Sequence, residues 1–167
     1  MPHPTLGLPP RDATAGLPAA AGRLRASRRR IARLALENTV RLFPAFSDAY
    51  DEDALRLFLR DYERHIEQLA RALETGDRYY VTHYAEWLVP VLRRRRVPMK
   101  HFIALLRGLR DAAATVLTPA ESEVVAQHLD RAEAVLQHHR RLPGDHPGNP
   151  IVRFFWKGAG ILDDEVV

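Results

Sequence analysis

Apolar side chains recur every three or four residues along most of the chain, which is the spacing of one face of an α-helix. The pattern runs through residues 23–43, 51–75, 77–96, 98–117 and 119–142. None of these stretches shows the alternation of apolar and polar residues that is typical of a β-strand. The sequence therefore predicts an all-α protein, a bundle of about five to six helices.

Turn and cap residues separate these predicted helices. Asp48 or Asp51 can cap the second helix, which stops at Gly76, a residue suited to the left-handed conformation that ends helices. Thr118 and Glu121 form a capping box, in which the threonine hydroxyl accepts from an amide and the glutamate reaches back. Local sequence thus defines most of the helix boundaries.

The helix predicted over residues 77–96 carries the widest apolar face in the chain. Pro90 has no amide hydrogen to donate, so a bend is expected in the last two turns. Arginines at 93–96 follow at the C-terminal end, where the helix dipole favours cations. The residues on the apolar face are Tyr80, Val81, Tyr84, Trp87, Leu88, Val91 and Leu92.

Composition changes at both ends of the helical pattern. Residues 1–22 are rich in proline, glycine and alanine without an apolar period, so they are predicted to be a disordered segment. Residues 23–142 form the predicted domain. Residues 143–167 are an apolar and acidic tail, which is expected to fold back on the bundle or to dock on a partner.

Size and charge narrow the class of protein. A chain of 167 residues fits one domain with tails, and the absence of cysteine excludes disulfides, thiolate metal sites and cysteine nucleophiles. The net charge of +4 comes almost entirely from arginine. No uncharged apolar run is long enough for a transmembrane helix, so no membrane insertion is expected. The absence of cysteine makes a cytoplasmic location the simplest expectation.

Several features occur in a characteristic order between residues 48 and 142. A helix with His65 is followed by a Gly-Asp break, Tyr79-Tyr80, a helix that ends in arginines, the Val97-Pro98 corner and two long helices. This order resembles the sensor globins of globin-coupled sensors and the haem-free globin domains of stressosome sensor proteins. The resemblance implies a globin-like bundle, a signalling role as a sensor domain, a homodimer and a separate signalling partner protein.

The resemblance also bears on haem. In haem-binding sensor globins the proximal histidine stands shortly before the proline of the corner, and Leu92 holds the corresponding place in this chain. Leucine offers no axial donor to iron. The resemblance therefore implies a globin-like domain without standard haem ligation, in which a small apolar ligand can occupy the vacated pocket. The candidate pocket residues are Tyr62, Tyr80, Tyr84, Trp87, Leu88, Leu92 and Phe102.

Two alternatives stay open. A haem-binding, gas-sensing globin with displaced ligation would use His83 or His101, although no metal or cofactor is the favoured expectation. A basic helical nucleic-acid binder would use the arginines within 23–33 and 93–96, but no recognisable nucleic-acid module accompanies them. No nucleophile, phosphate loop or paired-carboxylate motif supports catalysis, so an enzyme is not predicted.

Overall fold

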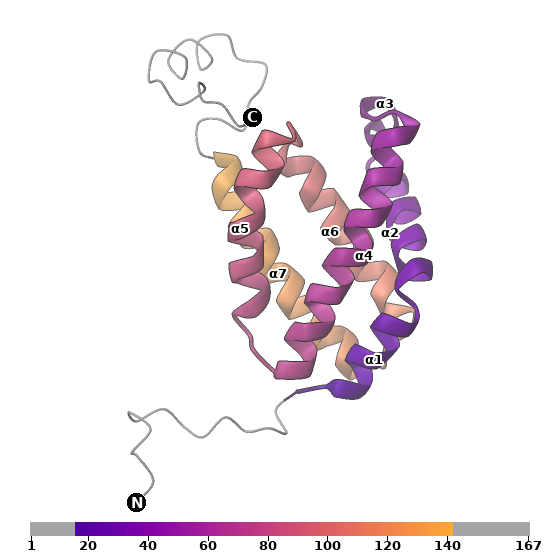
Figure 1. The fold of residues 1–167 in the computed structure, drawn as a ribbon, viewed down its shortest axis with the longest axis vertical. Helices are drawn as coiled ribbons and strands as arrows, with labels where there is room; N and C mark the ends of the chain where they lie inside the picture. Colours follow the sequence, from indigo (N-terminus) through magenta and orange to yellow (C-terminus); the bar gives the residue numbers. More distant parts are fainter. Residues whose placement is uncertain (1–15, 142–167) are drawn as a thin grey trace, which may run out of the picture.

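The computed structural model describes residues 16–141, and this part of the chain is helical throughout apart from its turns (Figure 1). The predicted all-α class is confirmed, with seven helices in the described residues where five to six were expected. None of these helices has the length and apolar character needed to cross a membrane. The helices are α1 (Pro18–Ala26), α2 (Arg28–Leu42), α3 (Ala45–Ala49), α4 (Glu52–Thr75), α5 (Tyr80–Arg94), α6 (Met99–Ala114) and α7 (Pro119–Arg141).

The bundle begins earlier than the sequence pattern indicated. Helix α1 starts at Pro18, inside the segment predicted to be disordered, and it buries Ala20 and Ala21. Proline suits the first helical turn because its missing amide hydrogen has no partner there anyway. The amide of Leu17 donates to the carbonyl of Leu73 at 2.6 Å, which ties the start of α1 to the end of α4. Residues 1–15 and 142–167, including the predicted apolar tail, lie outside the described residues.

The expected caps are present. Asp51 accepts a hydrogen bond from the amide of Ala54 at 2.8 Å, and Gly76 ends α4 in the left-handed conformation with a φ of 65°. The capping box at the start of α7 is also confirmed. The amide of Thr118 donates to Glu121 Oε2 at 2.8 Å, and the amide of Glu121 donates to the threonine hydroxyl at 3.3 Å.

The helices pack in two overlapping groups. Helices α1 and α2 lie along α4, whereas α5 lies mainly along α7, and α6 joins the groups by packing on both α2 and α7 (Figure 1). Helices α4 and α5 run in opposite directions at the front of the bundle in this view, with a smaller shared interface. The described core is one continuous apolar cluster that extends through all of these helices.

Helices α2 and α6 approach each other closely where they cross. A Cβ atom added at Gly108 would lie 2.3 Å from Thr39 Oγ1 and 2.5 Å from the carbonyl oxygen of Ala35. The hydroxyls of Thr39 and Tyr62 are 2.9 Å apart, and Tyr62 also donates to the carbonyl of Leu105 at 2.8 Å. The buried hydroxyl of Tyr62 on α4 therefore forms hydrogen bonds with both α2 and α6.

Candidate functional site

Three polar pairs cross between α4 and α5, and we call their six residues the α4–α5 seam. Tyr80 donates its hydroxyl hydrogen to Gln68 Oε1 at 2.7 Å, and the Tyr84 hydroxyl lies 2.7 Å from His65 Nδ1. Arg95 Nη1, just past the end of α5, binds Asp61 Oδ2 at 2.5 Å. The pairs line up because residues three and four apart share one face of a helix.

A small apolar cavity of about 30 Å³ lies directly behind the seam. One water molecule needs about 10–15 Å³ of such space, whereas pockets for organic ligands are typically about 300–1,000 Å³. The cavity in this conformation therefore suits only a very small guest. Its polar lining comes from His65 and Gln68, and its apolar lining includes Leu69, Ala85, Leu88, Phe102, Leu129 and Ala132.

His65 and Tyr84 are the titratable groups in the described lining of this cavity. Burial lowers the pKa of the His65 imidazole to about 4; the carboxylate of Asp61 opposes this shift, while Arg95 and Arg64 reinforce it. The ring of Phe102 meets the imidazole edge-on, with ring centres 5.2 Å apart. Burial likewise raises the pKa of Tyr84 to about 12. Both partners of this pair are therefore neutral at pH 7, and the cavity wall carries no charge from them.

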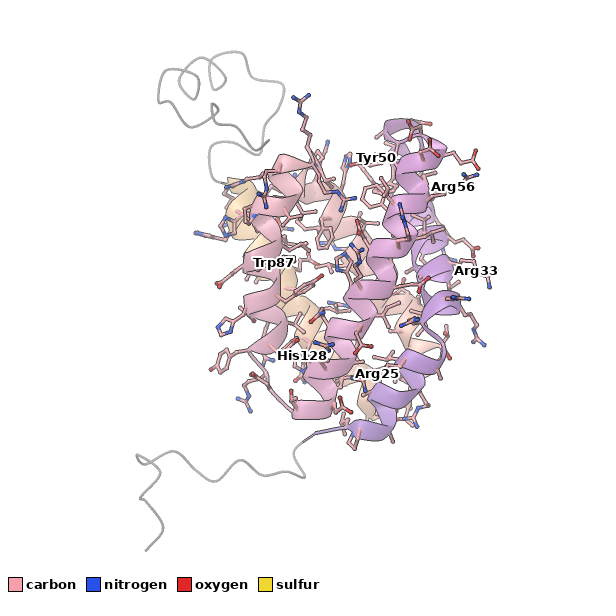
Figure 2. The ribbon with its side chains drawn as sticks, viewed as in Figure 1. Arg25, Arg33, Tyr50, Arg56, Trp87 and His128 are labelled. Atoms are coloured by element: carbon pink, nitrogen blue, oxygen red, sulfur yellow. The ribbon has the colours of Figure 1, made fainter. Side chains whose placement is uncertain are left out.

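Trp87 lies on the surface next to the seam. Its indole is 61% exposed and stacks on the ring of Tyr84, with ring centres 5.7 Å apart and an angle of 22° between the planes. Figure 2 labels Trp87 on the α5 side of the molecule. A movement of Tyr84 would therefore change the surroundings of an exposed tryptophan.

The predicted pocket residues divide between four places: the cavity, the seam, the surface and the core away from the cavity. Tyr84, Leu88 and Phe102 line the cavity. Tyr80 belongs to the seam, and Trp87 lies on the surface. Tyr62 and Leu92 are buried in the core but do not line the cavity, and the Tyr62 hydroxyl forms hydrogen bonds with α2 and α6.

His65 and Gln68 were not among the predicted pocket residues. A histidine and a glutamine at one edge of an apolar helix face are a weak signal, because such residues usually end up half exposed. Only the three-dimensional placement of α5 over α4 brings them to the cavity.

The two histidines nominated for displaced haem ligation do not face this cavity. His83 is exposed on α5. His101 is buried, its Nδ1 lies 2.7 Å from the Tyr50 hydroxyl, and its ring packs against Phe43 and Phe46. Within residues 16–141 no group of three histidines or carboxylates is placed to hold a metal ion. The residues present therefore do not fit a haem held by His83 or His101 in the cavity.

Comparisons with known proteins give no further assignment. No protein-family model, curated protein or solved structure matches the chain.

Proposed function

We propose that this chain is a non-enzymatic, globin-like sensor or protein-interaction domain that responds to a small apolar ligand at the α4–α5 seam. The observation that carries the proposal is an apolar cavity whose lining includes His65, Gln68 and Tyr84 of the seam, with the His65–Tyr84 pair at its edge. The homodimer and the separate signalling partner stay predictions from the sequence.

The seam can open without unfolding the bundle. A single hydrogen bond contributes about 0.5–1.5 kcal/mol, and an exposed ion pair contributes about 0–1 kcal/mol. Helix α5 keeps its larger interface with α7 when these pairs separate. A ligand shifts such an equilibrium by its difference in affinity for the open and closed forms.

Opening would carry a signal to the surface. A guest larger than the present cavity displaces Tyr84 from His65, and Trp87 moves with Tyr84 because the two rings are stacked. The outer face of α5 would then present a different surface to a partner protein. Chemistry at the seam is not required, because the response consists of packing changes alone.

Trp87 fluorescence provides the test. The chain has two tryptophans, so the Trp156→Phe variant leaves Trp87 as the sole reporter. Titration with benzene, medium-chain alcohols and medium-chain fatty acids is expected to give a saturable change in emission with at least one class. Ala132→Val, which adds methyl groups to the cavity wall, is expected to weaken that response. Ala134→Val on the exposed side of α7 is the matched control.

A flat response to every ligand class would reject the proposal for the seam. Parallel titration with hemin distinguishes the haem alternative, because a Soret band that saturates at one equivalent would favour it. His83→Ala and His101→Ala would then test which imidazole is the ligand.

A further inference from the structure

Some arginines of this chain form ion pairs in the structure and others do not, although the sequence alone does not tell them apart. On α1 and α2, Arg23 pairs with Glu121 and Arg28 with Glu63, while Arg25 pairs with both Glu67 and Glu74. These guanidinium groups hold the bundle together and are not free for a partner.

A second group of cations has no such partners. We call it the basic end, and it comprises Arg93, Arg94, Arg96, Lys100, Arg140 and Arg141. The C-terminal ends of α5 and α7 lie at the same end of the bundle, and Arg93 Nη2 lies 3.4 Å from the carbonyl oxygen of His139 (Figure 1). Within the described residues, none of these cations forms an ion pair with a carboxylate, whereas the neighbouring Arg95 binds Asp61.

Helix dipoles account for only part of this cluster. Cations in the last turn of a helix contribute about 0.3–1 kcal/mol each, and the effect falls off within that turn. Four of the six cations occupy such positions, namely Arg93, Arg94, Arg140 and Arg141. Arg96 lies beyond the end of α5 and Lys100 lies near the start of α6, where a helix dipole disfavours a cation.

Arg96 adds a second observation. Its φ of 57° is left-handed, and the amide of Val97 donates to the carbonyl of Leu92 at 2.9 Å. This is the helix-ending motif in which glycine is the usual residue, because a side chain in that conformation costs about 1–2 kcal/mol. The backbone at position 96 would favour glycine, yet the chain has an arginine there, whose side chain is exposed at the basic end.

From this arrangement we propose that the basic end binds an acidic segment of a partner protein. The planar guanidinium matches a carboxylate with two parallel hydrogen bonds, and clustered arginines are a recurrent receptor for acidic motifs. The cations gather at one end of α5, α6 and α7 and do not form a stripe along the bundle, which favours a short acidic peptide over an extended nucleic-acid strand. The inference rests on the protein-interaction part of the proposed function, but it does not involve the cavity.

Fluorescence anisotropy of a labelled, end-capped Glu/Ala octapeptide tests this, with the Gln/Ala peptide as the uncharged control. The full chain is expected to bind the Glu peptide saturably at low salt and more weakly as salt rises, because salt screens exposed charges. The variant R94Q/R96Q/R140Q/R141Q is expected to bind about tenfold more weakly or worse, a loss of about 1.4 kcal/mol or more.

The chain offers a matched control. The variant R29Q/R30Q/R33Q/R60Q removes the same charge from exposed arginines on α2 and α4 that also form no ion pair in the described part of the chain. Its affinity is expected to stay within about twofold of the parent, since rim charges elsewhere chiefly change the association rate. Circular dichroism melts of both variants verify that each remains folded.

Three results would overturn the inference. They are failure of the Glu peptide to bind, an equal loss in both quadruple variants, and tighter binding of a ten-residue oligothymidylate that depends on the same arginines.

The triple change D163N/D164N/E165Q examines the chain's own acidic run. Tighter peptide binding in that variant would support the inference, because it would identify these residues as a competitor for the basic end. None of these measurements uses a cavity ligand, so their failure leaves the proposal for the seam untouched.

Discussion

The Nδ1 atom of His65 on α4 lies 2.7 Å from the hydroxyl of Tyr84 on α5, and this pair forms the middle of the seam. The cavity lies behind it and Trp87 stacks on its outer side. Because burial lowers the pKa of His65 to about 4, the imidazole is neutral in the folded protein at physiological pH. The seam therefore couples packing at the cavity to the protonation of one residue.

His65 is expected to make stability depend on pH between about 6.5 and 4. The unfolded imidazole takes up its proton near pH 6.5, whereas the folded one does so near pH 4. Stability from this group is therefore complete above pH 6.5 and falls as the pH drops to about 4, by about 3 kcal/mol at most. Urea unfolding at pH 7.0, 5.5 and 4.5 measures the decline.

The matching variant is His65→Gln, which keeps a hydrogen-bonding side chain and removes the titration. His101, His128 and His139 also have lowered pKa values, chiefly through burial, so some pH dependence is expected to persist. The variant should lose less stability than the parent across this range. Identical pH profiles for the two proteins would contradict the assignment of the effect to His65.

Gly108→Ala should be strongly destabilising. The added methyl group would meet Thr39 Oγ1 and the backbone carbonyl of Ala35 at the α2–α6 crossing, and a backbone atom cannot rotate away. We expect a loss of about 3 kcal/mol, at the upper end of overpacking costs. Gly22→Ala on α1 is the control, because nothing lies within 4 Å of its added methyl. It should stabilise the protein by about 0.5–1 kcal/mol, and the same sign for both variants would refute this reading.

Arg96→Gly is expected to separate stability from partner binding. Glycine relieves the left-handed backbone strain at this position, so the free energy of unfolding should rise by about 0.5–1 kcal/mol. Affinity for the Glu peptide should fall, since one guanidinium is removed. Arg94→Gly, in the last turn of α5, is the control and should destabilise by about 1 kcal/mol. Thermal melts and anisotropy on the same samples provide both readouts.

Asp61→Asn is expected to loosen the seam more than it lowers global stability. The ion pair with Arg95 is partly exposed, so its loss should cost no more than about 1 kcal/mol in urea unfolding. Hydrogen exchange of α5 amides should nevertheless become faster, because local opening requires less free energy than global unfolding. The α2 amides provide the internal reference. Equal acceleration in both helices would indicate global destabilisation instead.

Local sequence signals predicted the helical class and several helix ends, because caps act within a few residues. The capping box of Thr118 and Glu121 and the glycine stop at Gly76 are both present. The beginning of helix α1, residues 18–22, was predicted to be disordered because Pro18 and Gly22 lie in a stretch of linker-like composition, whereas in the structure this part of α1 packs on α4. Propensity alone does not report such tertiary packing.

The site was harder to predict than the fold. The aromatic face of α5 was visible, but the sequence could not say which rings point inward, and Tyr62 proved to be hydrogen-bonded to Thr39 across the core. His65 became a site residue only through the packing of α4 against α5. The sequence does not distinguish Arg23, Arg25 and Arg28 from the arginines of the basic end, and only the carboxylates that lie beside the first three in space separate them.

The positions of the two ends of the described bundle determine the distance between any segments attached to them. The start of α1 and the end of α7 lie at opposite ends of the molecule (Figure 1). At about 1.5 Å per residue, the 23 residues of α7 span roughly 35 Å. A circular permutant that joins these ends would need a linker of about ten extended residues to bridge that length. Segments attached directly before α1 and after α7 would therefore begin about one bundle length apart.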